Sequence, residues 1–176
     1  DLIASKGSST FSAITPMGRQ HENDREATAA DLKWLADPAE EPEPFGDGGT
    51  KMAWNTFNVV SIYPNGNPVM SDVNQRWVGD CCACAVIASM AYLYPRFVKH
   101  IIKDNMDKTY TVTMYDPKGK QISVGVGGDY FIGNSGDLGA LGGRNKEVTW
   151  ATILEKAMIK WNQIYQGSSN VGGIGT

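Results

Sequence analysis

The chain has 176 residues, of which 41% are hydrophobic, so it has room for one ordinary domain with a sizeable core. Its formal net charge of −3 comes with no dense cluster of basic residues, and we therefore expect no nucleic-acid binding. The uncharged, mostly apolar run at residues 81–95 is too short to cross a bilayer, so we expect no membrane span.

Residues 1–50 differ in composition from the rest of the chain. Residues 22–36 carry a short helical pattern, and residues 37–44 are acidic and rich in proline, which disfavours regular structure. We predict that residues 1–50 are an N-terminal extension or prosegment with an acidic linker, and that residues 51–176 form the folded domain. The extension is either a tail without a role or a prosegment that covers a cleft until it is removed.

The first elements expected in the folded domain are a strand and a helix. Residues 57–63 alternate loosely between apolar and polar and run into a turn at residues 64–68. Residues 81–94 are apolar on every side, which predicts a helix buried all round. After Pro95, residues 97–102 continue a helical face.

The second half of the domain predicts a hairpin, a connection and a helix. Residues 109–115 and 121–126 flank the turn sequence 116–120, which is typical of a β-hairpin with one solvated face. The glycine-rich residues 127–143 lack the ending of a phosphate-binding loop, so we expect a flexible connection. Apolar residues at helical spacing in residues 150–165 predict the clearest amphipathic helix of the chain.

Three cysteines, Cys81, Cys82 and Cys84, lie within four residues, and we expect no disulfide scaffold from neighbours so close. Zinc is not favoured, because a second ligand cluster is missing and both histidines are distant in the sequence. Cys81 and Cys84 have the spacing of a redox pair, although the βαβ context of thioredoxin-like proteins is absent. Cys84, and to a lesser degree Cys82, also suits the role of a small buried hydrophobe.

Cys81 is the strongest candidate for a nucleophile. It follows Gly79 and Asp80 and begins the apolar helix, where unpaired backbone N–H groups and the helix dipole favour a thiolate. Gln75, six residues earlier, can donate its amide N–H to the oxygen of a tetrahedral intermediate. The backbone N–H of Cys81 would be the second donor of this oxyanion hole.

These residues resemble the calpain signature, in which a glutamine precedes a glycine-aspartate-cysteine and an alanine-rich helix that ends in alanine-serine. The family usually has tryptophan directly after the nucleophile, where this chain has Cys82. Residues 150–157, followed by Tyr165, resemble the family's helix with tryptophan and leucine-glutamate-lysine-alanine. The resemblance covers about residues 57–173.

The resemblance implies an α+β protein with the papain-like cysteine protease fold. This chain would be the mainly helical, cysteine-bearing subdomain with its β-hairpin, without the histidine subdomain. It implies a cysteine endopeptidase in which Cys81 attacks a peptide bond and Gln75 holds the oxyanion. We expect the histidine and asparagine after Thr176, in a longer precursor or in a second polypeptide left by cleavage, because neither His21 nor His100 fits the base.

Calpain-like cores also bind calcium, and here the resemblance places Asp72 among the ligands together with backbone carbonyls around residues 65–67. Gln166 stands where the family has a glutamate, so we expect weak calcium binding at most and no required cofactor. The other interpretation of Asp72 is a solvated loop carboxylate. Two alternative functions stay open: a non-catalytic binding module and a thiol-redox protein. The compartment is not determined, with a secreted or cell-surface location favoured over the cytoplasm.

Overall fold

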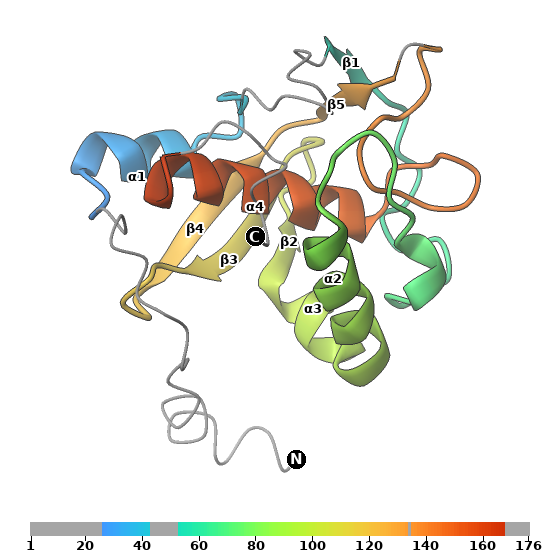
Figure 1. The fold of residues 1–176 in the computed structure, drawn as a ribbon, viewed down its shortest axis with the longest axis horizontal. Coiled ribbons are helices and arrows are strands. Elements are labelled where there is room, and N and C mark those ends of the chain that lie inside the picture. Colours follow the sequence, from blue (N-terminus) through green and yellow to red (C-terminus); the bar gives the residue numbers. More distant parts are fainter. Residues whose placement is uncertain (1–25, 43–52, 134, 168–176) are drawn as a thin grey trace.

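The structure, a computed structural model, describes residues 26–42, 53–133 and 135–167. Within these residues the protein is of mixed α+β class, which confirms the predicted class (Figure 1). All strand pairs are antiparallel, and helices and strands do not alternate regularly along the described residues. The helices are α1 (Ala29–Ala36), the 3₁₀ helix η2 (Met70–Asp72), α2 (Cys81–Leu93), α3 (Pro95–Ile101) and α4 (Trp150–Tyr165).

The strands form two small antiparallel sheets. One contains β1 (Ala53–Thr56) and β5 (Asp129–Ile132), and the other has the order β2-β3-β4. The three strands of the second sheet are β2 (Ile102–Asp104), β3 (Tyr110–Tyr115) and β4 (Gln121–Val126).

The predicted β-hairpin is confirmed as β3 and β4. Their register runs from Tyr110 opposite Val126 to Tyr115 opposite Gln121. Gly119 lies in the connecting turn with φ +81°, a backbone conformation that glycine adopts without strain. Turn chemistry and strand pattern therefore agree at this place, as hairpins require.

Helix α4 lies across the second sheet, with α1 beside it (Figure 1). Its apolar side chains, including the fully buried Trp150, Ile153 and Ala157, fill the core as the periodicity predicts. The opposite side of α4 is buried too, because Lys156 and Lys160 are covered by the segment that follows α1. The helix is thus enclosed on nearly all sides.

The described part of the N-terminal region packs on this same core. Thr28 caps α1 reciprocally with Asp31, and Leu35 is fully buried. Residues 37–42 then run along β4, where a Cβ atom at Gly125 would lie 2.3 Å from the carbonyl oxygen of Ala36. The division at residue 50 stays a prediction, but residues 29–42 lie against the domain rather than apart from it.

The strand predicted at residues 57–63 is wrong. β1 ends at Thr56, and residues 57–63 are irregular. Their apolar residues contact the core singly: the ring of Phe57 lies edge-on to that of Tyr130, and Ile62 is buried. The carbonyl of Ile62 accepts a hydrogen bond from the backbone N–H of Trp150, so a helix start, not a neighbouring strand, satisfies this backbone.

Helix α2 is not buried all round. Its inner face carries Ala83, Cys84, Ile87 and Ala91, whereas its other face is exposed. An apolar helix is buried on all sides only if other elements cover each of its faces. Within the described residues, no element covers the outer face of α2.

Helix α3 begins at Pro95 and turns sharply away from α2, with 112° between the two axes. Within the described residues no single helix is long and apolar enough to cross a membrane. Among the described helices, the bent pair of α2 and α3 taken together reaches the length and composition of a span.

Candidate active site around Cys81

The loop that leads to Cys81 is held by the glycine-rich segment. The backbone N–H of Asn74 donates to the carbonyl of Gly142 at 3.0 Å, and that of Trp77 donates to the carbonyl of Gly139 at 3.0 Å. Residues 138, 140 and 141 of this segment are buried. The prediction of a flexible connection over residues 127–143 is wrong: the segment contains strand β5, and its described part after β5 is a packed loop that positions residues 74–80.

Cys81 is the first residue of α2, as predicted, and its free thiol is exposed. Asp80 is the N-cap residue, yet its side chain makes no capping hydrogen bond. The first intrahelical bond runs from the N–H of Cys84 to the carbonyl of Asp80. The backbone N–H groups of the first turn consequently have no intrahelical acceptor and no cap from Asp80, which favours a negative charge beside Cys81.

The carboxyl group of Asp80 points into the protein instead. It is 1% exposed and accepts a hydrogen bond from the Cys84 thiol at 3.3 Å. Glu155 of α4 is also 1% exposed and accepts a hydrogen bond from the backbone N–H of Leu141 at 3.0 Å. The second oxygen of each carboxyl group, Oδ2 of Asp80 and Oε1 of Glu155, has no hydrogen-bond partner among the described residues.

These two buried carboxyl groups interact electrostatically with each other. Burial raises the pKa of Asp80 and raises that of Glu155 further, with the charge of Asp80 adding to the effect on Glu155. The interaction between them lowers the pKa of Asp80, against the larger effect of burial, and raises that of Glu155. The pair joins the start of α2 to the middle of α4, and thus joins the two motifs that carry the calpain resemblance.

The other two cysteines have opposite environments. Cys84 is buried as expected, and burial, followed by the charge of Asp80, raises the pKa of its thiol. Cys82 is exposed, so it is not a buried hydrophobe. A hydrogen bond with the neighbouring Cys81 raises the pKa of the Cys82 thiol.

Gln75 lies at the other end of the loop from Cys81. Its side-chain Nε2 donates to the carbonyl of Val78 at 2.9 Å, which holds the amide over the loop. An amide NH₂ has two donor hydrogens, and this bond uses one of them. The second hydrogen can donate to the oxygen of a bound substrate. The role of Gln75 as an oxyanion donor stays a prediction.

The described residues contain one histidine, His100. It is exposed in the last turn of α3, in agreement with its interpretation as a helix-end surface residue. His21 lies outside the described residues. The expectation that the imidazole comes from elsewhere in the protein stays a prediction.

Asp72 is buried, at 2% exposure, so its interpretation as a solvated loop carboxylate is wrong. Its carboxylate accepts hydrogen bonds from Asn65 Nδ2 at 2.9 Å, from the backbone N–H of Val69 at 3.2 Å and from Trp150 Nε1 at 2.7 Å. Asp72 therefore ties the 65–72 turn to the start of α4.

Lys99 lies among the oxygens of the turn next to Asp72. Lys99 donates to the carbonyl of Gly66 at 2.7 Å and to the side-chain oxygen of Asn67 at 3.2 Å. An ammonium group thus already binds one of the backbone carbonyls expected to join Asp72 as calcium ligands, and calcium prefers six or more oxygens. Gln166, the other expected ligand, is exposed at the end of α4. Calcium binding stays a prediction, and these contacts make it less favourable.

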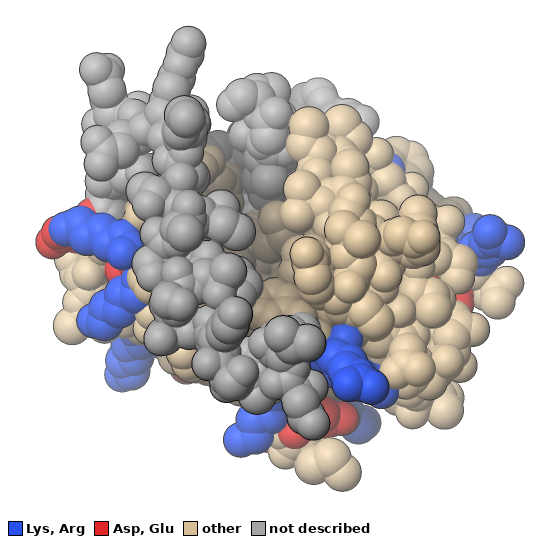
Figure 2. Space-filling view, turned by 90° about the horizontal axis from the view of Figure 1, so that it is seen from below, with Lys and Arg blue, Asp and Glu red and all other residues tan. Residues whose placement is uncertain are grey.

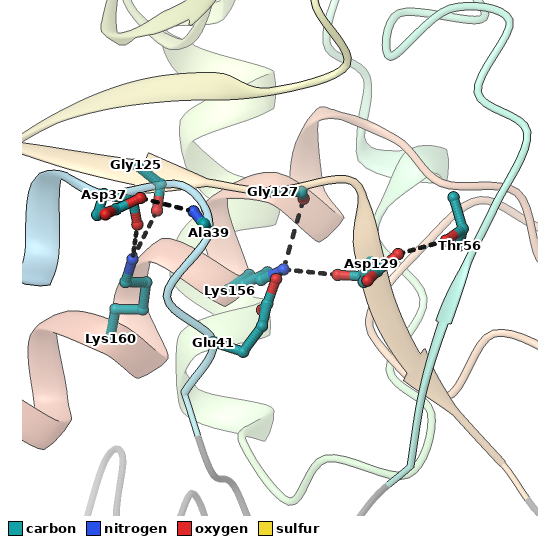
Figure 3. Close-up of polar contacts among 9 residues, drawn as sticks. All are labelled: Asp37, Ala39, Glu41, Thr56, Gly125, Gly127, Asp129, Lys156 and Lys160. Carbon is teal, nitrogen blue, oxygen red and sulfur yellow. Dashed lines mark hydrogen bonds and ion pairs between the residues drawn. The ribbon is translucent and has the colours of Figure 1, made fainter.

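Two buried lysines of α4 were not singled out from the sequence. Lys156 is 2% exposed and donates to the carbonyl of Asp129 at 2.6 Å (Figure 3). It also forms an ion pair with Glu41 at 2.5 Å and lies 4.6 Å from the ring centroid of Trp54. Burial lowers the pKa of Lys156, and the charge of Glu41 opposes this.

Lys160, one helical turn further along, is fully buried and donates to the carbonyls of Asp37 at 2.8 Å and Gly125 at 2.9 Å (Figure 3). Burial lowers its pKa to about 8. The signal in the sequence was charge complementarity: two lysines four residues apart and an acidic segment, residues 37–43, with no other basic partner assigned.

Comparison with known proteins finds no family model and no curated protein that matches this chain.

Proposed function

We propose that this chain is the cysteine-bearing part of a papain-like cysteine endopeptidase, with Cys81 as the nucleophile. The observation that carries the proposal is the exposed thiol on the first residue of α2, next to an N-cap carboxyl that turns inward. Backbone N–H groups at a helix start stabilise a thiolate. Because the Asp80 side chain points inward and does not cap the helix, these groups can interact with the thiolate and with the substrate.

In this proposal the Cys81 thiolate attacks the carbonyl carbon of a peptide bond. The backbone N–H of Cys81 and the second amide hydrogen of Gln75 stabilise the oxyanion that forms. A histidine from a region or chain after Thr176 protonates the leaving amine, and an asparagine orients it. Water then hydrolyses the acyl-enzyme and frees the thiolate.

The exposed face of α2 supports the proposal that another part of the protein packs against it. Val86 is 56% exposed and Leu93 is 59% exposed, and they line one apolar groove together with Met90 and Tyr94. The face seen in Figure 2, on the side of α2 and α3, has a broad uncharged area with charged side chains at its margins. We propose that the part of the protein that carries the histidine covers this groove.

The test is peptidase activity of the complete protein, with Cys82→Ala as the matched control for Cys81→Ala. Both thiols are exposed and adjacent, so general effects of removing a surface thiol are equal. We expect Cys81→Ala to abolish cleavage and Cys82→Ala to leave most of it. Equal loss from both substitutions, or cleavage by Cys81→Ala, would contradict the proposal.

A second measurement separates the endopeptidase from a non-catalytic binding module. In the 176-residue chain, iodoacetamide at neutral pH should modify Cys81 much faster than Cys82 or Cys84, since alkylation follows the thiolate fraction. The chain alone should not cleave peptides, and adding the histidine-bearing part should restore cleavage. Uniform, slow alkylation would favour the binding module.

A further inference from the structure

We propose that Cys84 is a resolving thiol, which forms a reversible disulfide with Cys81 when Cys81 is oxidised by a hydroperoxide. The two cysteines occupy the first and fourth positions of α2, with Cys81 exposed and Cys84 buried beneath it. In an α-helix residues three apart have Cα atoms about 5 Å from each other. That separation lies inside the range of about 4.4–6.8 Å that disulfides require.

Cys82 is less suited to this role although its thiol is exposed and adjacent to Cys81 in the sequence. Consecutive Cα atoms are about 3.8 Å apart, which is below the usual range for a disulfide. Consecutive helical residues also do not face each other. Geometry therefore selects Cys84.

The surroundings of Cys84 provide a proton acceptor. Its thiol donates to Oδ1 of Asp80 at 3.3 Å, and both groups are shielded from water. Asp80 in turn interacts electrostatically with Glu155, whose Oε1 has no hydrogen-bond partner among the described residues. Burial makes the carboxylate form of Asp80 costly, so an Asp80 carboxylate that takes a proton becomes neutral and loses this cost.

The Cys81 thiolate attacks the hydroperoxide, its sulfur is oxidised to the sulfenic acid, and the alcohol or water of the hydroperoxide leaves. Cys84 transfers its proton to Asp80 and attacks the Cys81 sulfur, so that an S–S bond forms and the S–O bond breaks. The departing hydroxide takes the proton from Asp80 and leaves as water. A dithiol reductant returns both thiols by exchange.

The inference rests on the proposed function in one respect, the reactivity of Cys81. It assigns to Cys84 and Asp80 a role that peptide cleavage does not need. The disulfide would store an oxidised nucleophile in a recoverable form, because sulfinic acid at Cys81 would be irreversible. Peptidase activity is not the readout, so this inference and the proposed function can fail separately.

The experiment treats the 176-residue chain with hydrogen peroxide and follows it by mass spectrometry with dimedone as the sulfenic-acid trap. The unsubstituted chain should lose the mass of two hydrogen atoms, yield a peptide that links Cys81 to Cys84, and return to its starting mass with dithiothreitol. Cys84→Ala should instead accumulate the dimedone adduct and then sulfinic acid at Cys81. Cys82→Ala should behave as the unsubstituted chain.

Asp80→Asn tests the proton acceptor without removing the thiol. Asparagine keeps an oxygen for the Cys84 thiol but cannot take its proton, so disulfide closure should slow at least about ten-fold. The rate of sulfenic-acid formation, measured in the same samples, should change less. A circular dichroism melt checks that Cys84→Ala and Asp80→Asn are folded.

Three results would overturn the inference. The first is a disulfide that survives in Cys84→Ala and disappears in Cys82→Ala. The second is direct passage of Cys81 to sulfinic acid in the unsubstituted chain, with no intermediate disulfide. The third is an Asp80→Asn variant that closes the disulfide at the unsubstituted rate, which would remove Asp80 from the reaction.

Discussion

Replacing Lys160 by methionine tests whether α4 buries a titratable charge. Lys160 is fully buried, and its ammonium group is held by the carbonyls of Asp37 and Gly125. Methionine has a similar length and flexibility but no charge. The substitution thus removes the titration while it keeps most of the packing.

The magnitude follows from the pKa of Lys160, which burial lowers from 10.5 to about 8. Between these values the unfolded chain binds more protons than the folded chain, so stability rises with pH. Full deprotonation corresponds to about 3 kcal/mol, of which about 2 kcal/mol is expressed between pH 7 and about pH 9.5. The unsubstituted chain should therefore gain about 2 kcal/mol relative to Lys160→Met across this interval.

The assay is urea unfolding at several pH values, compared as the difference between the unsubstituted chain and the variant. Other groups that titrate in this interval, such as the thiols, are present in both proteins, so their contributions to the free energy of unfolding cancel in the difference. Lys118→Met is the matched control, because the side chain of Lys118 is 71% exposed and its partner Glu26 raises its pKa. The difference in free energy of unfolding between the unsubstituted chain and Lys118→Met should therefore not change with pH. A flat difference for Lys160→Met as well would refute the argument that Lys160 is charged and desolvated.

Four further predictions concern the site and its support. Gln75→Ala in the complete protein should lower turnover about 10²-fold or more without changing the melting temperature, and unchanged turnover would make Gln75 a loop residue only. Asp72→Ala should lower the free energy of unfolding by more than about 2 kcal/mol, since three donors lose their acceptor. Calcium in place of EGTA should not shift the melting temperature, and a shift that Asp72→Ala abolishes would establish the calcium site. Gly125→Ala should cost about 1–3 kcal/mol and increase protease cleavage within residues 37–42, whereas unaltered cleavage would contradict their close packing on β4.

The elements that the sequence predicts correctly depend on short-range signals. The start of α2 at Cys81, the hairpin of β3 and β4, and the length of α4 each follow from residues within the element or directly beside it. The candidate nucleophile could be selected in the same way, because the start of a helix is a local property. The strand at residues 57–63 failed, since alternation also arises where an irregular segment contacts a core.

Burial was the property that the sequence alone could not decide. The all-apolar helix α2 has an exposed face, and the charged helix α4 is enclosed. A charge can be buried only where partners satisfy it, and the partners of Lys156 include Glu41 and the carbonyl of Asp129, both far away in the sequence. Asp80 and Glu155 are brought together in the same way. The tertiary structure therefore decided which charges are buried, because each buried charge depends on groups that only the fold brings within hydrogen-bonding distance.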